Sequence, residues 1–395
     1  MDELVLILNA GSSSVKFAVY DEQADGLKEI CSGQAEGLLT TPRFSARREG
    51  GGREEHAIAE TGHDAAIMFL ATWLRATFPG AKLWAVGHRV VHGGDPPPGP
   101  TLVDEALLAR LEELIPQMPL HLPHNLAPMR TIARLQPEVP QVACFDTSFH
   151  RTMPRVEQIF AIPRALIAEG VRRYGFHGLS YEYVARRLKA VAPDIADGKV
   201  VVAHLGSGAS MCAMEGGRSV ATTMGFTGLD GLPMGTRPGS VDPGILLYLM
   251  EAKGMGAHEM EDFLYRRCGL LGLSGGISND MRELLASDAP EAAEAVDYFI
   301  HRACRELGSL AAALGGLDAL VFTAGIGERS AFIRAAICRR SSWLGIELDE
   351  RANNENRTII SRPGSAVTVL VVPTDENRVI AEQTHALVQQ REIAP

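Results

Sequence analysis

A loop of small polar residues and one lysine lies between two short apolar runs at the start of the chain. The run Leu4–Leu8 precedes Asn9-Ala-Gly-Ser-Ser-Ser-Val-Lys16, and Phe17–Tyr20 follows it. Backbone N–H groups in such a turn can face an anion, while the serine hydroxyls add donors and the lysine adds charge. It is not a Walker P-loop, because the residues after it continue as a strand instead of opening a helix. The pattern indicates either a phosphate-binding hairpin or an ordinary turn with solvated serines.

One later segment repeats this pattern, and a third loop is also rich in glycine. Residues Val200–Met214 again read as strand, small-residue loop and strand, with His204-Leu-Gly-Ser-Gly208 as the loop. The first and second loops lie about half the chain apart, which indicates two similar halves. A third loop, Thr323-Ala-Gly-Ile-Gly-Glu328, ends a strand and opens a helix, where backbone donors can hold an anion or a nucleotide sugar. Together the three loops predict a nucleotide cleft between duplicated domains.

The elements that must position these loops alternate between strand-like and helical patterns. Helices are indicated after Ser180, from Asp242 to Gly254 and at Asp280, by capping residues, a proline in the first turn and a stop glycine. Ligands of open α/β sheets bind at strand ends. Because strand-like and helical patterns alternate, we expect an α/β protein. We also expect surface loops at 42–55 and 95–100. The buried strands that we expect are Leu83–Gly87, Gln141–Phe145, Lys199–Ala203, Ala319–Thr323 and Val367–Val372.

Composition excludes several classes of protein. The chain has 395 residues, 46% of them hydrophobic and 22% charged, which is enough for two or three globular domains. The net charge of −10 argues against nucleic acid or an anionic membrane surface as a partner. No apolar run approaches the ~20 residues that span a bilayer, and no secretory signal follows Met1. The six cysteines lack C-x-x-C pairs, which favours small buried thiols and a cytoplasmic location.

Eight blocks along the whole chain resemble, in order, the signature blocks of the acetate kinase family. The resemblance implies two duplicated ribonuclease-H-like domains of the type shared by sugar kinases, actin and heat-shock chaperone ATPases. It assigns residues 1–148 and the C-terminal helix 377–395 to a first domain, and residues 149–376 to a second, nucleotide-binding and dimerising domain. The blocks are Asn9-x-Gly-Ser-Ser-Ser-x-Lys16, Gly87-His-Arg-Val-Val-His-Gly-Gly94, Phe145-Asp-Thr147, Arg173-Tyr-Gly-Phe-His-Gly178, Gly231-Leu-Pro-Met-Gly-Thr-Arg237, Ser278-Asn-Asp-Met-Arg282, Gly325-Ile-Gly-Glu328 and Pro373-Thr-Asp-Glu376.

The activity implied by the resemblance is a reversible, Mg²⁺-dependent or Mn²⁺-dependent transfer of phosphate between ATP and acetate. It gives acetyl phosphate and ADP by direct in-line transfer. The carboxylate of acetate is already ionised at pH 7, so no general base is needed. The obstacle is the approach of two anions, and a site for this reaction should be rich in cations. Arginine suits it because its planar donors match carboxylate and phosphate oxygens two at a time.

The resemblance also implies roles for individual residues. Arg89 binds the carboxylate and the acyl phosphate, while His177 and Arg237 stabilise the transition state. Asp146 belongs to the active site, and we expect it to orient an arginine, His177 or metal-bound water. Four positions match the lining of the family's acyl pocket: Val91, Leu120, Phe176 and Gly228.

The nucleotide and its metal are assigned to the loops. Asn9 and Glu376 match the family's metal positions and offer the hard oxygens that Mg²⁺ prefers. We expect the phosphates to contact Ser12, Ser14 and Lys16. The β/γ-phosphate region is expected at His204, Leu205, Gly206, Ser207 and Gly208. Ribose and base are expected between Asp280, Met281, Arg282, Gly325, Ile326, Gly327, Glu328 and Arg329.

Purely structural roles stay open for several of these residues. His177 is flanked by glycines and could be a turn residue. Arg89 could form a buried structural ion pair, for instance with Asp146. Glu376 could cap the helix that follows it, and Asp280 could be an N-cap.

Departures from the family pattern leave the acceptor open. Ser207, Arg329 and Leu122 stand where asparagine is common, which affects nucleotide affinity or base selectivity in the first two cases. Gly228 stands where the family usually has proline, so the acyl pocket could be wider. One methylene is worth only ~1–3 kcal/mol in such a pocket, and propionate or another short-chain acid is the alternative acceptor.

Two further classes of function are alternatives to a carboxylate kinase. An actin-like or chaperone-like nucleotide switch would not need Arg89, His177 or Arg237. A sugar kinase would need a carboxylate base next to a hydroxyl. The family forms homodimers through its second domain, and an apolar helix such as Ile245–Met250 could serve that interface or the core.

Overall fold

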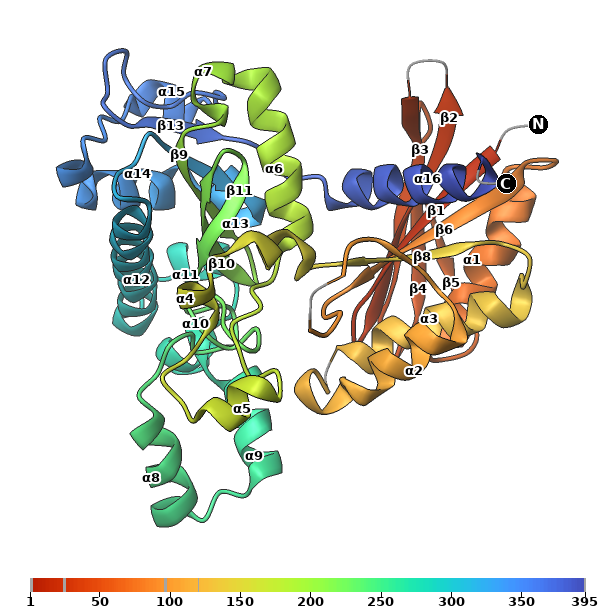
Figure 1. Ribbon diagram of the computed structural model, residues 1–395, viewed down its shortest axis with the longest axis horizontal. Helices are drawn as coiled ribbons and strands as arrows, with labels where there is room; N and C mark the ends of the chain where they lie inside the picture. The colour runs from red at the N-terminus through yellow and green to blue at the C-terminus, as the bar shows by residue number, and fades with distance from the viewer. Residues whose placement is uncertain (1–2, 24–25, 96–97, 120, 394–395) are drawn as a thin grey trace. The chain divides into compact units, whose positions relative to one another are not determined.

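The computed structural model describes residues 3–23, 26–95, 98–119 and 121–393, and the chain divides into two compact units (Figure 1). The first unit comprises Met1–Ser148 and Asp375–Pro395, and the second comprises Phe149–Thr374. Within the described ranges, no helix is long and apolar enough to cross a membrane.

The first unit is built on a mixed sheet in the order β5-β4-β3-β2-β1-β6-β8-β7. Its strands are β1 (Glu3–Ala10), β2 (Ser14–Gln23), β3 (Gly26–Glu36), β4 (Arg43–Arg48), β5 (Arg53–Ala57), β6 (Lys82–Val90), β7 (Thr101–Leu102) and β8 (Gln141–Phe145). Its helices are α1 (His63–Thr77), α2 (Glu105–Glu113), α3 (Leu122–Leu135) and α16 (Glu376–Ile393).

The second unit has a five-stranded sheet in the order β11-β10-β9-β12-β13. Its strands are β9 (Lys199–Leu205), β10 (Ala209–Glu215), β11 (Arg218–Thr222), β12 (Ala319–Thr323) and β13 (Thr368–Val371). Its helices are α4 (Arg155–Gln158), α5 (Arg164–Ala168), α6 (Gly178–Val191), α7 (Pro193–Ala196), α8 (Pro243–Lys253), α9 (Ala257–Asp262), α10 (Gly269–Leu273), α11 (Met281–Leu285), α12 (Pro290–Leu314), α13 (Ala324–Arg329), α14 (Ala331–Arg340) and α15 (Glu350–Asn354).

The two sheets repeat one topology, which confirms the predicted duplication. In the first unit β1, β2 and β3 pair antiparallel, and β6 and β8 continue from β1 as parallel strands. In the second unit β9, β10 and β11 pair antiparallel, and β12 and β13 continue from β9 as parallel strands. The two small-residue loops therefore occupy the same place in both units, at the turn of the first hairpin.

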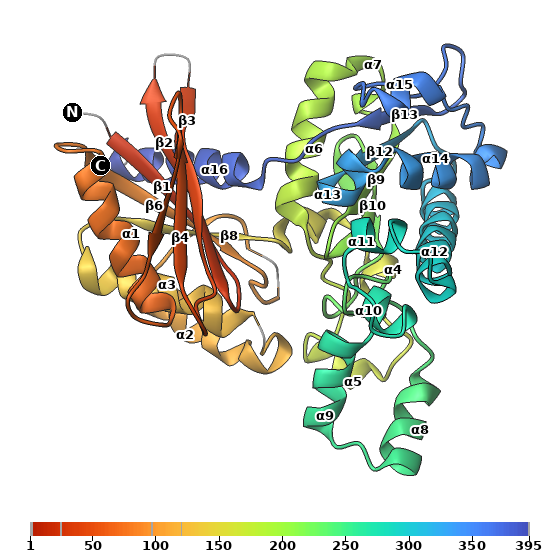
Figure 2. The ribbon, with the colours of Figure 1, turned by 180° about the vertical axis from the view of Figure 1, so that it is seen from behind.

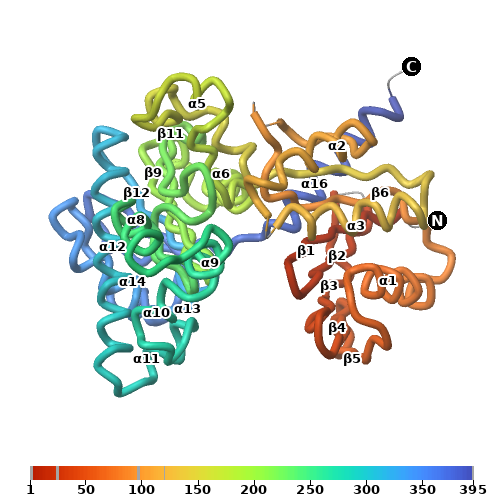
Figure 3. Tube along the Cα trace, turned by 90° about the horizontal axis from the view of Figure 1, so that it is seen from below, coloured from red at the N-terminus to blue at the C-terminus, as the bar shows by residue number. Residues whose placement is uncertain are grey.

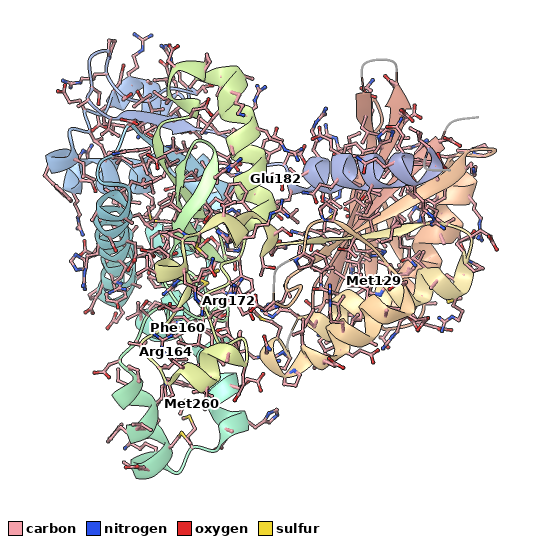
Figure 4. All side chains as sticks on the ribbon, viewed as in Figure 1. Met129, Phe160, Arg164, Arg172, Glu182 and Met260 are labelled. Atoms are coloured by element: carbon pink, nitrogen blue, oxygen red, sulfur yellow. The ribbon has the colours of Figure 1, made fainter. Side chains whose placement is uncertain are left out.

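Both faces of the first sheet are covered along its central strands. Helices α1 and α3 pack on one face and α16 on the other (Figure 2). A glycine makes the close approach of α16 possible, since a Cβ at Gly87 would lie 2.4 Å from Thr384 Oγ1 and 2.7 Å from Ile380 Cγ2. Two buried polar side chains on these strands are paired: His88 Nε2 lies 2.7 Å from Gln141 Oε1, and Gln141 donates to the carbonyl of Met129, which Figure 4 labels on α3.

The prediction of a surface loop at 42–55 is wrong. These residues form most of the β4–β5 hairpin at the sheet edge, where Figure 3 shows β3, β4 and β5 in succession. Phe44 and Ala46 are buried, and the Phe44 ring stacks on Phe17 with centroids 5.4 Å apart. Most of the charged residues that indicated a loop are exposed positions of β4 and of β5, which is the edge strand of the sheet. In the segment predicted at 95–100, residues 98–100 are irregular, and 96–97 lie outside the described residues.

The second sheet is covered by α6 on one face and by α12 on the other (Figure 1). Tyr181, Val184 and Leu188 of α6 pack on apolar residues of the central strands. The predicted helix after Asp242 is present as α8, with the Asp242 side chain accepting from the backbone N–H of Gly244 and Gly254 as its C-cap. The predicted buried thiols are confirmed for four of the six cysteines, and burial raises the pKa of Cys31, Cys212 and Cys338 to about 12.

Candidate active site

In the first unit, four of the predicted site residues lie together. Arg89 donates to Asp146 twice, from Nε to Oδ1 at 3.0 Å and from Nη2 to Oδ2 at 2.7 Å. Arg89 Nη1 lies 3.5 Å from Asn9 Oδ1, and Arg89 Nε lies 3.7 Å from Glu376 Oε2. The guanidinium of Arg89 therefore lies next to the predicted active-site aspartate and both residues assigned to the metal.

The sheet topology explains this convergence. Asn9 is near the end of β1, Arg89 is near the end of β6, and Asp146 follows β8 directly. These three strands are parallel neighbours, so their carboxyl ends meet at one edge of the sheet. Glu376 is the first residue of α16, but the helix cap is Asp375, whose Oδ1 accepts from Arg378 N. The carboxylate of Glu376 is thus directed to Arg89 and not used as a cap.

The electrostatics keep Arg89 charged. Burial lowers the pKa of Arg89, but the charges of Asp146 and Glu376 and the hydrogen bonds to Asp146 outweigh it and raise the pKa above its ordinary value. The Asp146 side chain is 3% exposed and that of Arg89 is 21% exposed. The expected alternative of a buried Arg89–Asp146 ion pair is therefore present, and the exposed part of the guanidinium remains available to an anion.

The other predicted residues of the first unit that the structure describes lie on the β1–β2 hairpin and directly after β6. Ser12 is exposed at the β1–β2 turn, Ser14 begins β2, and Lys16 is exposed as the third residue of β2. Val91 follows β6, and its backbone N–H donates to Asn125 Oδ1 at 3.1 Å. Leu120 lies outside the described residues.

Asn125 is a positioning residue that the sequence did not reveal. Its amide also donates to the carbonyl of Ala10 at 2.9 Å, so it joins the end of β1 to the residue after β6. Its side chain is 4% exposed on α3. A buried asparagine among the apolar positions of a helix would have been the only signal.

In the second unit, His177 and Arg237 lie against the β9–β10 loop. A Cβ built on Gly208 would lie 2.8 Å from Arg237 Nη2 and 3.2 Å from His177 Nε2. His177 is the N-cap of α6 in the left-handed region, with φ of 58°. Only a glycine in the loop leaves room for both side chains at this point.

Hydrogen bonds fix the His177 ring. Its Nδ1 lies 2.8 Å from Ser210 Oγ, which in turn lies 2.5 Å from Tyr181 Oη. The ring also stacks on His204, with centroids 4.2 Å apart, and His204 Nδ1 lies 2.8 Å from Ser180 Oγ. With Nδ1 occupied by Ser210, Nε2 is the ring atom directed to the loop and the guanidinium of Arg237.

The space beside Gly228 is occupied by Arg237. A Cβ on Gly228 would lie 2.8 Å from Arg237 Nη1, and the same Nη1 donates to the Gly228 carbonyl at 2.7 Å. The glycine thus lets the guanidinium approach the backbone. The absence of a side chain at residue 228 suggested a wider acyl pocket, but the Arg237 guanidinium occupies this space. Phe176 is buried beside the site, and its carbonyl lies 2.9 Å from His150 Nε2.

A pocket of about 550 Å³ in the second unit brings together many of the predicted nucleotide residues. It lies between the β9–β10 loop, the start of α11 and α13. The predicted residues that line it are Gly206, Ser207, Asp280, Met281, Arg282, Gly325, Ile326 and Arg329. His204, Leu205, Gly208, Gly327 and Glu328 are not among the lining residues.

Two acidic residues of this region have structural partners. Asp280 caps α11 through Arg282 N and also accepts from the Arg282 guanidinium, and these hydrogen bonds lower its pKa to about 2. Glu328 Oε1 accepts from the backbone N–H groups of Ala324 and Thr374. Asp280 thus has the N-cap role that was left open, and Glu328 supports the third loop from within.

Three lining residues were not predicted: Asn279, Leu285 and Ser330. Asn279 lies within the quoted block at Ser278, and Leu285 is one helical turn after Met281, so helical spacing would have found it. Ser330 follows the third loop and caps α14.

Comparison with known proteins places the chain among phosphotransferases. Residues 4–382 match the model of the acetokinase family. The chain is 53% identical over 394 residues to an acetate kinase of Rhodopseudomonas palustris, covering 98% of this chain and 99% of that protein. Its fold is similar to an acetate kinase of Porphyromonas gingivalis, with a TM-score of 0.88, 36% identity and coverage of 98% and 100% of the two chains. It is also similar to a propionate kinase from Francisella tularensis, with a TM-score of 0.91, 35% identity and coverage of 97% and 99%. The chain is therefore a member of the acetokinase family, and its two domains repeat one sheet topology.

Proposed function

We propose that this protein is an acetate kinase, which reversibly transfers the γ-phosphoryl group of ATP to acetate and yields acetyl phosphate and ADP. The observation that carries the proposal is the Arg89 group. A guanidinium held by Asp146 at the ends of parallel strands offers its remaining donor surface to a carboxylate. A nucleotide switch has no need for such a cation, and the family match favours an enzyme.

The reaction proceeds by attack of an acetate oxygen on the γ-phosphorus. The new O–P bond forms as the bond to the β-phosphate oxygen breaks, and ADP leaves with that electron pair. No proton is removed from the acceptor, because acetate is already ionised. In this proposal Arg89 holds the carboxylate, and Arg237 and His177 Nε2 stabilise the charge on the equatorial oxygens. Asp146 orients Arg89.

ATP is the co-substrate and lies with ribose and base in the pocket next to Asp280 and Arg282, while Ser12, Ser14 and Lys16 contact phosphates. We propose that the transfer uses residues of both domains, the first comprising residues 1–148 with 375–395 and the second residues 149–374.

Asn9 and Glu376 fit a Mg²⁺ ion, which Mn²⁺ could replace. Their amide and carboxylate oxygens converge on Arg89, and Mg²⁺ takes one or two protein ligands together with phosphate and water. Among the described residues, no group of three or more His, Cys, Asp or Glu side chains could hold a metal without other ligands. When bound, the ion neutralises phosphate charge.

Acetate is the proposed acceptor in preference to propionate. The relative from Rhodopseudomonas palustris is an acetate kinase at 53% identity, whereas the propionate kinase structure is 35% identical. The contact of Arg237 with Gly228 also removes the reason to expect a wider pocket. The propionate alternative is not favoured.

We further propose a cytoplasmic homodimer that does not bind nucleic acid and takes part in acetyl-CoA biosynthesis. Helix α8 of the second unit supports the dimer, since its apolar side chains are 47–58% exposed at Ile245, Leu247, Tyr248 and Met250. An exposed apolar patch of this kind indicates a protein interface. Light scattering would show a dimer for the wild type and a monomer for Leu247→Glu. A wild-type monomer would refute the dimer.

The activity is tested by trapping acyl phosphate with hydroxylamine after incubation with ATP, Mg²⁺ and acetate. We expect acetyl hydroxamate from the wild type and at least a hundredfold less from Arg89→Ala. We expect Arg110→Ala, an exposed arginine of α2, to match the wild type. Absence of hydroxamate with acetate and with propionate would refute the proposal.

A further inference from the structure

A second cavity, of about 580 Å³, lies on the sheet of the first unit and shares no lining residue with the nucleotide pocket of the second. Strands β2, β3 and β4, the β4–β5 turn and the start of α16 form it. We call this cavity the basic sheet face. Its polar lining comprises Lys16, Ser32, Ser45, Arg47, Arg53 and Asn377, together with Gln34.

The basic sheet face has a charge opposite to that of the protein. The chain as a whole carries a net charge of −10. The lining contains three cations, Lys16, Arg47 and Arg53, and no carboxylate. The other polar groups are hydroxyls and amides, which can donate hydrogen bonds to an anion. Such a local reversal of charge predicts an anionic ligand.

Strand register brings the cations to one face. Arg47 pairs directly with Arg53 on β5 and with Ser32 on β3. Lys16 pairs with Gln34, and Gln34 pairs with Ser45, two residues before Arg47. Directly opposed side chains of antiparallel strands share a face, and opposed like charges destabilise the pair. The directly opposed Arg47 and Arg53 side chains therefore repel each other, and an anion bound between the two guanidinium groups would relieve this repulsion.

The protein itself does little to neutralise these charges. Arg53 pairs with Glu55 at 3.0 Å, but both side chains are more than 60% exposed, which makes the pair weak. Within the described ranges, neither the Arg47 side chain nor the Lys16 side chain forms a hydrogen bond or an ion pair with another residue. Both side chains are exposed. The donors are thus available to a ligand from solution.

We propose that the basic sheet face binds a compact, soluble polyanion that carries phosphate groups, with Arg47 and Arg53 as its principal contacts and Lys16 as the third. Arginine binds phosphate oxygens in pairs, and three cations in one cavity fit a ligand with more than one negative charge. A consequence rests on the proposed function: Lys16 is also assigned to the nucleotide phosphates. A polyanion on the basic sheet face then competes for Lys16 and raises the KM for ATP.

Binding is tested by calorimetric titration of the full chain with inorganic tripolyphosphate without nucleotide. We expect the double variant Arg47→Gln/Arg53→Gln to weaken tripolyphosphate binding at least tenfold. The control Arg110→Gln removes one positive charge outside the cavity and should leave the binding unchanged. Arg282→Gln, in the nucleotide pocket, should also leave this binding unchanged. Equal affinity of the double variant and the wild type would overturn the proposal, because the probe would then bind only at the nucleotide loops.

Two further measurements keep the test decisive. If circular dichroism shows that the double variant is not folded, Ser45→Glu places a carboxylate in the same cavity, and it should weaken tripolyphosphate binding as well. Binding only to vesicles that contain phosphoinositides, and not to tripolyphosphate, would overturn the assignment to a soluble ligand.

The consequence for ATP is tested separately. Tripolyphosphate should raise the KM for ATP in the wild type and in Arg110→Gln. In the double variant this increase in KM should be at least fivefold smaller. Without tripolyphosphate, the kcat of the double variant should stay within twofold of the wild-type value. Equal inhibition of all three would contradict the competition for Lys16. Failure of the protein to form acetyl phosphate would refute the proposed function and leave the calorimetric result to decide the site.

Discussion

Arg89 holds Asp146 through two hydrogen bonds, at 3.0 and 2.7 Å, and both oxygens of the aspartate are therefore used. A carboxylate in this position is an acceptor for the guanidinium and fixes its plane. It is poorly placed to remove a proton, and acetate has none to remove. Asp146 thus acts through Arg89, and its replacement should affect the binding of the acceptor.

We expect Asp146→Asn to lower kcat/KM for acetate about 10-fold to 100-fold, since hydrogen bonds to charged groups are worth ~1.5–3 kcal/mol. Most of the loss should appear as a higher KM for acetate. Steady-state kinetics from pH 6 to 9 would measure it, with Asp194→Asn, an exposed carboxylate of α7, as the control. A wild-type acid limb in kcat that disappears in Asp146→Asn would instead identify Asp146 as a general base.

The two stacked histidines have different serine partners, so substitution of each serine tests the role of one histidine. Ser210 Oγ lies 2.8 Å from His177 Nδ1, and Ser180 Oγ lies 2.8 Å from His204 Nδ1. We expect Ser210→Ala to lower kcat about tenfold, because His177 loses the partner that fixes its ring. Ser180→Ala should instead raise the KM for ATP. We expect His177→Ala to lower kcat about a hundredfold, the cost of one preorganised donor. Identical kinetic effects of the two serine variants would contradict this separation.

The sequence predicted the elements that carry the site better than the contacts within it. The hairpins at Asn9 and His204 and the strand before Asp146 follow from apolar periodicity and from turns of small residues. The β4–β5 hairpin was missed because the edge strand β5 is exposed along nearly its whole length, and its charged residues next to three glycines resemble a loop. Ser210 and Asn125 were missed because their partners lie 33 and 34 residues away along the chain, and only tertiary packing brings them together.

Arg237 and His177 lie close to Gly208, so a substitution at Gly208 should affect activity without a matching effect on stability. A Cβ at residue 208 would lie 2.8 Å from Arg237 Nη2, which is the mobile end of a long side chain. Gly208 does not have a positive φ, so alanine brings no backbone strain. We expect Gly208→Ala to lower kcat more than tenfold, because the guanidinium is displaced. The free energy of unfolding should change by less than about 1 kcal/mol.

Gly256→Ala is the matched control for this substitution. No heavy atom lies within 4 Å of a Cβ at residue 256, and its φ of −76° suits alanine. Steady-state kinetics and urea unfolding of both variants would provide the comparison. Full activity of Gly208→Ala, or a loss of activity in proportion to a loss of stability, would contradict a role for the Arg237 position.

Two buried histidines make stability depend on pH. Burial lowers the pKa of His88 and of His150 to about 4, although His88 is bonded to Gln141 and His150 to the Phe176 carbonyl. In the unfolded chain a histidine titrates near pH 6.5. Between pH 6.5 and 4 the unfolded state therefore binds more protons than the folded state. The contribution of each histidine to stability is fully present above pH 6.5 and is lost as the pH falls through this window.

At pH 5 the expected loss is on the order of 2 kcal/mol for each histidine, relative to pH 7.5. Replacing one of them with a side chain that does not titrate should reduce this loss. We expect urea unfolding of His88→Gln at the two pH values to show a smaller difference than in the wild type, because glutamine can still bond to Gln141. His258→Gln, whose side chain is fully exposed, should behave as the wild type. If the difference in unfolding free energy between the two pH values is the same in His88→Gln as in the wild type, His88 is charged in the folded protein at pH 5. The buried hydrogen bond to Gln141 would then not keep His88 neutral.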